Sequence, residues 1–376
     1  MEWKELKEIF DTRNGYTPST SNETFWEGGT IPWFKMEDIR DNGSILNDSY
    51  LHITDKAIKG KGLFKANSIL LATSATIGEH ALIEVEHLSN QRFTNFYPKK
   101  GYENRINMRY AYYYMYIIDE WCKQHINQGG FASVDMGGLY KLPFPIPPLS
   151  DQQRIVEQLD TFTSSIENLK EQIVQRRKQY EYYRDQLLDL EGNEGVKLFA
   201  LKEVCDVING RAYSQPELLS EGKYRVLRVG NFFSNDSWYY SDLELEDKYY
   251  CNKGDLLYAW SASFGPHIWE EEKVIYHYHI WKMNCKEGLQ TKYMYYWLQS
   301  EDMKKQAFSN LHGATMAHLT KVLMESLKVP VPPLSEQQRI VSILDTFESS
   351  INNLEQQLAQ REKQYEYYRN KLLTFE

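Results

Sequence analysis

Several common sequence signals are missing from this chain of 376 residues. It has no run of 18 apolar residues and no leader-like start, so we expect a cytoplasmic protein that does not cross a membrane. The four cysteines (122, 205, 251 and 285) lack the paired spacing of a metal site, and we expect reduced thiols. His277 and His279 share one face of a predicted strand, but two histidines alone do not make a zinc site.

Catalytic motifs are absent too. The chain has no Walker A loop, no GxGxxG after a strand, no HExxH, no GxSxG, and no Asn/Asp-Pro-Pro-aromatic motif of an amino-methyltransferase. The glycine pairs at 28–29 and 137–138 indicate turns. We therefore expect a non-catalytic protein. A nuclease with scattered carboxylate ligands stays open as an alternative, which metal-dependent DNA cutting by the isolated chain would support.

The net charge of −9 argues mildly against nucleic-acid binding. The charge is spread unevenly, however. Residues 1–149 and 192–334 each carry 16 basic and 18 acidic residues, so each segment is close to neutral. A local basic face on either segment is therefore compatible with the composition.

One segment occurs twice. Residues 147–191 and 332–376 align without a gap at a shift of 185, and 31 of their 45 positions are identical. Each copy carries apolar residues at alternating steps of four and three, which predicts a helix of a coiled coil. The seam of the first copy is Ile155, Leu159, Phe162, Ile166, Leu169, Ile173, Arg176, Tyr180, Tyr183 and Leu187, and that of the second is Ile340, Leu344, Phe347, Ile351, Leu354, Leu358, Arg361, Tyr365, Tyr368 and Leu372.

The ends and the pairing of these helices are also predicted. Ser150 and Ser335 are expected N-caps, with Gln153 and Gln338 completing capping boxes, and 192–195 ends the first helix. Because the second half begins directly after the first helix, we expect the two helices to pair antiparallel. The charged seam positions Arg176 and Arg361 are expected to specify the register.

The segments 1–146 and 196–331 resemble each other more weakly. Four matched blocks begin at Leu6 and Leu201, Trp33 and Val226, Leu70 and Leu257, and Arg109 and Lys292, with shifts of 195, 193, 187 and 183. Strands are predicted at 68–73, 255–260 and 274–283, and helices at 108–124 and 291–310. We expect two α+β domains of one fold, each with a small and largely antiparallel sheet, related by a pseudo-two-fold axis through the two-helix coiled coil.

The twice-repeated block PPLS[DE]QQRIV, each followed by a helix ending in YEYYR, closely resembles the specificity subunit of type I restriction–modification systems over the whole chain. The resemblance implies two target recognition domains (1–146 and 196–331) that each read half of a split DNA site, and two conserved helices (147–191 and 332–376). It also implies two docked adenine-methyltransferase subunits, restriction subunits where present, and S-adenosylmethionine, ATP and Mg that belong to those partners. Residues Trp3–Gly15 are expected to cover the end of the second helix.

Candidate contact residues come from positions that match between the two domains. The expected DNA contacts are Lys35, Ser74, Thr76, Arg92, Arg225, Arg228, Ser261 and Ser263, although the hydroxyls could equally cap a strand turn. The expected methyltransferase contacts are the repeated helix residues, taken as exposed, Gln152, Gln153, Arg154, Gln337, Gln338 and Arg339; helix capping and solvation is the alternative. The aromatic residues 112–114 and 295–297 are expected in the core. A coiled-coil scaffold whose end domains bind proteins instead of DNA is the rival function.

Overall fold

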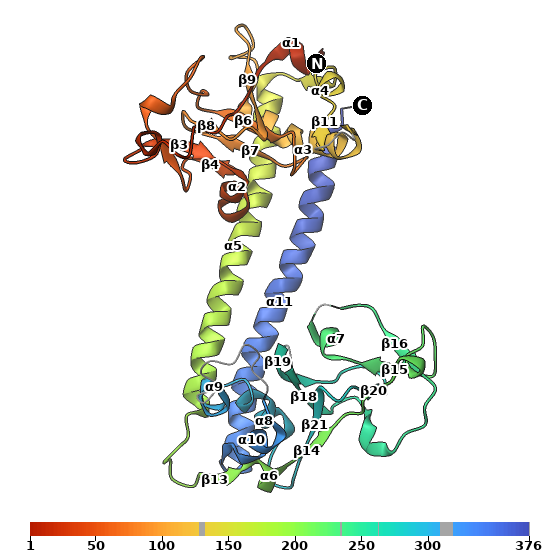
Figure 1. Cartoon of the computed structure of the whole chain (residues 1–376). Helices are drawn as coiled ribbons and strands as arrows, with labels where there is room; N and C mark the ends of the chain where they lie inside the picture. Colours follow the sequence, from red (N-terminus) through yellow and green to blue (C-terminus); the bar gives the residue numbers. More distant parts are fainter. Residues whose placement is uncertain (128–131, 234, 262, 309–318, 376) are drawn as a thin grey trace. The chain divides into compact units, whose positions relative to one another are not determined.

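The structure is a computed structural model that describes residues 1–127, 132–233, 235–261, 263–308 and 319–375. The chain divides into two units, each with an α+β domain and parts of two long helices (Figure 1). Unit 1 comprises Met1–Asn168 and Leu358–Glu376, and unit 2 comprises Leu169–Gln357. None of the helices in the described residues combines the length and the apolar character that a membrane span requires.

The domain of unit 1 contains two main sheets. The five-stranded sheet has the order β2-β9-β6-β7-β4 and the three-stranded sheet has the order β5-β3-β8. Their neighbours are antiparallel except for β4 with β7 and β3 with β8, which are parallel. The strands are β2 (Phe10–Asn14), β3 (Ile31–Phe34), β4 (Ile45–Leu46), β5 (His52–Ile53), β6 (Ser68–Ala72), β7 (His80–Ile83), β8 (Leu88–Ser89) and β9 (Phe93–Pro98).

Strand β6 is central because both of its faces are buried. Ile69 and Leu71 join the apolar cluster under helix α3, while Leu70 and Ala72 join a second cluster around Trp33. Short elements complete the domain: β1 (Glu2–Glu5) pairs with β12 (Pro143–Ile146), and the others are α1 (Leu6–Ile9), η1 (Glu23–Phe25), α2 (Met36–Asn42), η2 (Asp55–Ala57), α3 (Met108–Gln124), β10 (Ile126–Asn127), β11 (Ser133–Val134) and α4 (Met136–Leu139).

The domain of unit 2 contains two four-stranded sheets, ordered β14-β21-β18-β19 and β16-β15-β20-β17. The only parallel pair among these described strands is β15 with β20. The strands are β14 (Cys205–Asn209), β15 (Tyr224–Leu227), β16 (Tyr239–Ser241), β17 (Tyr250–Cys251), β18 (Leu256–Ser261), β19 (Ser263–Ile268), β20 (Val274–Tyr276) and β21 (Ile280–Cys285). The remaining elements are β13 (Lys197–Ala200) paired with β22 (Lys328–Val331), α6 (Leu201–Val204), η3 (Gln215–Glu217), α7 (Val229–Phe233), η4 (Asp247–Tyr249), α8 (Thr291–Trp297), α9 (Glu301–Phe308) and α10 (Lys321–Ser326).

The matched blocks fall on matched elements, which confirms the α+β class and the duplication. Helix α1 and strand β2 correspond to α6 and β14, and β3 corresponds to β15 at the predicted shift of 193. The helix at 108–124 is confirmed; Asn107 caps it by accepting from the backbone N–H groups of Arg109 and Tyr110. The aromatic residues 112–114 are buried, as expected.

Three expectations are wrong in detail. Each domain has two main sheets instead of one. The strand predicted at 274–283 is broken at 277–279, because β20 pairs with β17 and β15 whereas β21 pairs with β14 and β18. The helix predicted at 291–310 breaks before Ser300, whose hydroxyl donates to Trp297 O (2.7 Å) and accepts from Met303 N (3.2 Å). Residues 309 and 310 lie outside the described residues.

The two long helices are α5 (Leu149–Leu188) and α11 (Leu334–Leu373), each of 40 residues. In unit 1 the start of α5 packs on the end of α11, and in unit 2 the end of α5 packs on the start of α11, so the pairing within each unit is antiparallel. Phe162 stacks on Tyr368 with ring centroids 5.4 Å apart, and the matched Phe347 stacks on Tyr183 at 5.5 Å. The predicted seam is thus occupied by ring pairs at matched positions.

The helix starts differ from the predicted capping boxes. Pro148 O accepts from Asp151 N (2.9 Å) and Gln152 N (3.1 Å), so α5 begins at Leu149 and Ser150 lies in its first turn. Pro333 does the same for α11. The proline restricts the backbone to a conformation that suits a helix start, so no serine cap is needed. After α5, Gly192 and Gly195 adopt positive φ of 81° and 80° in the connection from this helix to the α+β domain of unit 2.

Candidate nucleic-acid interface

Each domain holds a three-residue segment where strands of its two main sheets end. Residues 90–92 in unit 1 lie between β8 and β9, and residues 277–279 in unit 2 lie between β20 and β21. We call these the strand-end segments. They match at a shift of 187, the shift of the block that begins at Leu70 and Leu257.

The same main-chain hydrogen bonds fix both segments, so the backbone frame at this site is duplicated. The four bonds in unit 1 run from Asn90 N to Phe34 O (3.0 Å), Thr73 N to Arg92 O (3.0 Å), Gly15 N to Phe93 O (3.0 Å) and Tyr16 N to Ser89 O (2.8 Å). Those in unit 2 run from His277 N to Leu227 O (2.9 Å), Trp260 N to His279 O (3.2 Å), Gly210 N to Ile280 O (3.1 Å) and Arg211 N to Tyr276 O (3.1 Å).

A glycine makes this frame possible in each unit. A Cβ atom on Gly15 would lie 2.2 Å from Asn90 O, and one on Gly210 would lie 2.4 Å from His277 O. Both distances are far shorter than van der Waals contact, and the atoms met are backbone atoms that cannot move aside. The two glycines therefore allow the chain after β2 and β14 to lie against the strand-end segments.

A basic residue adjoins each segment at a matched position. Lys35 follows Phe34 and Arg228 follows Leu227, which are the residues whose carbonyls hold the segments. Lys35 N donates to Asp38 Oδ2 at 2.8 Å, and Arg228 N donates to the matched Asn231 Oδ1 at 3.1 Å. The predicted residues Lys35, Arg92 and Arg228 are thus gathered at the strand-end segments.

The side chains on this common frame differ in chemistry. Unit 1 presents Asn90, Gln91 and Arg92, of which Gln91 and Arg92 are exposed. Unit 2 presents His277, Tyr278 and His279, and Tyr278 keeps 40% of its surface exposed. Aromatic groups adjoin the second segment: the ring of Trp260 lies 5.2 Å from that of His279, and Trp260 Nε1 donates to Tyr278 O at 2.9 Å.

The imidazole of His277 is held in its neutral form. Burial lowers its pKa to about 4, and the neighbouring His279 and Arg228 add to the effect. Its Nδ1 faces the backbone N–H of His279 at 3.4 Å. This N–H can only donate, so Nδ1 acts as an acceptor and the ring proton sits on Nε2. His277 therefore offers a hydrogen-bond donor at neutral pH without a charge.

Of the other predicted DNA contacts, two hydroxyl residues lie next to the strand-end segments, whereas Arg225 does not. Ser74 and Ser261 directly follow Thr73 and Trp260 and so lie next to the strand-end segments. Ser263 is exposed, whereas Ser261 is buried. Thr76 Oγ1 is buried and has no hydrogen-bond partner in the described part of the chain. Arg225 belongs to a different group, since it pairs with Glu271 (2.8 Å) and lies over the ring of Trp238 (4.7 Å).

Most residues of the second segment lie outside the sequence-based prediction. The pattern of His277 and His279 pointed only to a metal site, and no pattern marked Tyr278 or Trp260. The signal that could have found them is the match of 89–93 with 276–280 at the shift already known for the preceding block. Among the described residues, no group of three or more His, Cys, Asp or Glu side chains is gathered as metal ligands are.

A second repeated feature joins each domain to its long helix. Gln152 and Gln337 are fully buried, so the expectation that they are exposed is wrong. Gln152 Nε2 donates to Arg105 O and Pro147 O, both at 2.8 Å, and its Oε1 accepts from Asn107 N at 2.8 Å. Gln337 makes the matched bonds to Gly288 O, Pro332 O and Gln290 N. These glutamines tie the helices to their own domains, while Gln153, Arg154, Gln338 and Arg339 are exposed.

Exposed tyrosines repeat on the long helices. Tyr182 and Tyr183 of α5 are exposed by 61% and 47%, and the matched Tyr367 and Tyr368 of α11 by 59% and 43%. Within each pair the rings meet edge-on, with centroids 5.3 and 5.2 Å apart. We call these pairs the tyrosine patches. Exposed aromatic rings are enriched at protein interfaces.

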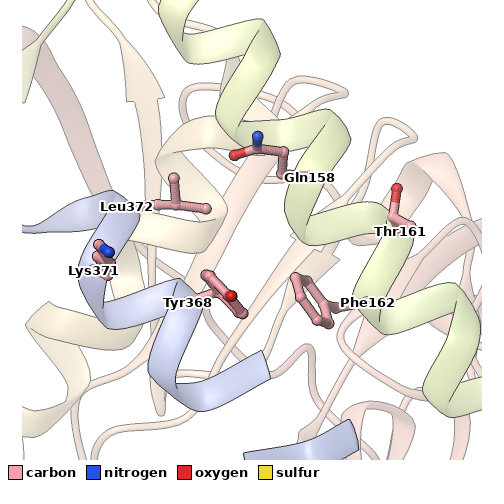
Figure 2. A pocket seen from close by; sticks show the side chains of 6 residues that line it. All are labelled: Gln158, Thr161, Phe162, Tyr368, Lys371 and Leu372. Carbon is pink, nitrogen blue, oxygen red and sulfur yellow. The ribbon is translucent and has the colours of Figure 1, made fainter. Parts of the chain in front are cut away.

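A hollow adjoins the patch of unit 1. It has a volume of about 500 Å³ and opens between α5 and α11, where Figure 2 shows the rings of Phe162 and Tyr368 facing each other. The residues that line it are Gln158, Thr161, Phe162, Tyr368, Lys371 and Leu372. At the matched positions of unit 2 the sequence has Ile343 and Gln186 in place of Gln158 and Lys371.

Comparison with known proteins identifies the family. The sequence profile described as the type I restriction modification DNA specificity domain matches residues 1–176 and again 193–362. The chain belongs to the type I restriction–modification specificity subunits. This specificity subunit is 34% identical over 369 residues to the EcoprrI specificity subunit of Escherichia coli, a match that covers 94% of this chain and 89% of the relative. It is 28% identical over 397 residues to a putative specificity subunit of Haemophilus influenzae, with coverage of 100% and 96%.

Solved structures share the fold. The S subunit from M. genitalium has a TM-score of 0.56 at 16% identity, covering 100% of this chain and 96% of that one. A chain from a study of complex assembly and conformational transition of the type I system has a TM-score of 0.67 at 16% identity, with coverage of 99% and 96%. The specificity subunit is thus the non-catalytic, DNA-specificity component of such a system. The rival interpretation as a scaffold that binds only proteins is superseded by the family match.

Proposed function

We propose that the specificity subunit reads a bipartite, asymmetric DNA site, with one half-site for each domain. Residues 1–146 and 196–331 are the two target recognition domains in this proposal, and 147–191 and 332–376 are the conserved helices. The observation that carries it is the duplicated strand-end frame, on which the two domains present different side chains. Since base pairs are distinguished by side-chain contacts in a groove, two domains with different side chains select two different half-sites.

We further propose that two adenine-methyltransferase subunits dock on the long helices, one at each tyrosine patch. The patches are identical in sequence and similar in exposure, which suits two copies of one partner. The partners bring S-adenosylmethionine, and restriction subunits, where present, bring the ATP- and Mg-dependent steps. The specificity subunit then contributes DNA recognition and the positioning of its partners, and no catalytic group, in keeping with its family.

The half-site proposal is tested by exchanging one domain. Residues 1–146 are replaced by the matching segment of the E. coli relative, and the chimera is expressed with its methyltransferase in a host that lacks other adenine methylation. Sequencing of methylated adenines should show one half-site changed and the other retained. A change in both half-sites, or in neither, would contradict the proposal. The chain alone, given labelled S-adenosylmethionine and DNA, should transfer no label.

The docking proposal is tested by charge insertion at one patch. Tyr182→Asp, which leaves the seam residue Tyr183 in place, should leave a complex with one methyltransferase copy, because a carboxylate in an apolar contact loses its hydration. Native mass spectrometry would count the copies. Val174→Asp is the matched control, since Val174 is exposed on the same helix but has Ala359 at its repeat position. Retention of two copies in the patch variant would rule out this surface.

A further inference from the structure

We propose that the strand-end segments are the base-reading elements of the specificity subunit, and that Arg92 reads guanine in one half-site while His277 and Tyr278 read a different base pair in the other. This inference rests on the proposed half-site function and assigns it to six residues.

The frame that the two units share is built from main-chain atoms. Its four matched bonds in each unit join backbone N–H and C=O groups, so these bonds use no side-chain donor or acceptor of the segment. Elements that read bases need such a rigid backbone, because a loose side chain loses discrimination. A basic residue beside each segment, Lys35 or Arg228, supplies the attraction to the phosphate backbone that base reading requires.

In unit 1, two of the three side chains of the segment, Asn90 and Gln91, already accept hydrogen bonds within the protein. Asn90 Oδ1 accepts from Arg92 N at 3.0 Å, and Gln91 Oε1 accepts from the Thr17 hydroxyl at 2.6 Å. Arg92 is exposed at the end of the segment, and an arginine fork binds O6 and N7 of guanine with two bonds. The bonds to Asn90 and Thr17 hold the segment in place around it, so Arg92 is the specificity-determining residue of this unit.

In unit 2 the segment contains no Lys, Arg, Asp or Glu. His277 is neutral and offers its Nε2–H, which pairs with a single acceptor such as a purine N7. The exposed ring of Tyr278 supplies apolar surface of the kind that contacts a thymine methyl group, and its centroid lies 4.4 Å from that of His277. An uncharged donor beside an aromatic ring differs from a guanidinium fork in both geometry and charge, so the two units select different base pairs.

The test exchanges the segments and leaves the domains intact. One variant carries Asn90→His, Gln91→Tyr and Arg92→His, and the reciprocal variant carries His277→Asn, Tyr278→Gln and His279→Arg. Arg92→Ala is the single-residue version, and Lys100→Ala is the control, an exposed lysine beyond the opposite end of β9. Each is expressed with the methyltransferase, and methylated adenines are mapped by sequencing.

We expect Arg92→Ala to lose preference for one G·C pair by about tenfold or more in one half-site and to keep the other half-site, which reports correct folding. The exchanged segments should alter preference at the same positions, and Lys100→Ala should match the parent. Unchanged preference in Arg92→Ala and in both segment exchanges would overturn this inference. The proposed function would survive that result if exchange of residues 1–146 still changed one half-site.

Discussion

The ring of Trp3 meets the ring of Phe375 edge-on, with 6.2 Å between their centroids and 82° between their planes. Both residues belong to unit 1, and the contact confirms that the start of the chain covers the end of α11. Linking the two ends of the sequence with a short glycine-rich segment and opening the chain within 192–195 should therefore give a folded permuted protein. Its methylation motif should equal that of the parent when measured in the same host. A permuted chain that folds but reads another motif would contradict the close placement of the two ends of the chain, on which this prediction rests.

Loss of a buried glutamine should destabilise the protein even without partners. Gln337→Leu removes three hydrogen bonds and leaves Gln290 N and two carbonyls without their partner. We expect a loss of about 3 kcal/mol in the free energy of unfolding, since each unpaired buried group costs roughly 1–3 kcal/mol. Urea titration of the isolated chain measures it. The neighbouring exposed Gln338→Ala should change the free energy by less than about 0.5 kcal/mol, and equal effects would refute the structural role.

Acid should weaken unit 1 through His87. This residue is fully buried between the rings of Phe34 and Phe64, and burial lowers its pKa to about 4. Since the unfolded chain takes up the proton near pH 6.5, stability is full above that pH and falls as the pH drops toward 4, by up to roughly 3 kcal/mol. His87→Phe should flatten the pH dependence of the unfolding free energy between pH 6.5 and 4.5. An unchanged slope would exclude His87 as its origin.

Glu348 should have the opposite pH signature in unit 2. Burial raises the pKa of this carboxyl, although the hydroxyls of Tyr295 (3.2 Å) and Tyr296 (3.0 Å) donate to it. Its contribution to stability is present at low pH and is lost as the pH rises through the raised pKa. Glu348→Gln should therefore raise the thermal midpoint at pH 8 more than at pH 4.5. Glu366→Gln, at an exposed position of the same helix, should show no such difference.

The charged seam residues Arg176 and Arg361 should affect the spacing between the two DNA half-sites more than the thermal stability of the protein. Arg361 lies over the ring of Phe162, with its guanidinium carbon 5.8 Å from the centroid, and both Arg176 and Arg361 are half-buried. Arg176→Leu with Arg361→Leu should keep or raise the thermal midpoint, because an apolar seam has no charge to desolvate. Methylation mapping should then show a broader range of spacer lengths between half-sites. An unchanged spacer with this double variant would exclude a role in register.

Local patterns in the sequence predicted local structure well. The heptads predicted the two long helices, and the helix predicted at 108–124 has the bounds of α3. The features that the sequence did not predict depend on contacts with residues that lie far away in the sequence. The break at 277–279 arises because β20 pairs with a strand 49 residues earlier, as in Val226 with Ile275, and the burial of Gln152 depends on Arg105. Neither partnership leaves a periodic trace in the chain.

The glycine beneath each strand-end segment has a consequence for how this protein can change. Because Gly15 and Gly210 let backbone rest on backbone, the bonds that the two units share require no particular side chain in the segments. Selection can therefore alter those side chains without first breaking the shared backbone hydrogen bonds. The amino acids of each segment can change while the backbone that carries them stays the same. A library randomised at residue 92, with Asn90 and Gln91 kept for the bonds they make, should remain folded and should sample new methylation motifs.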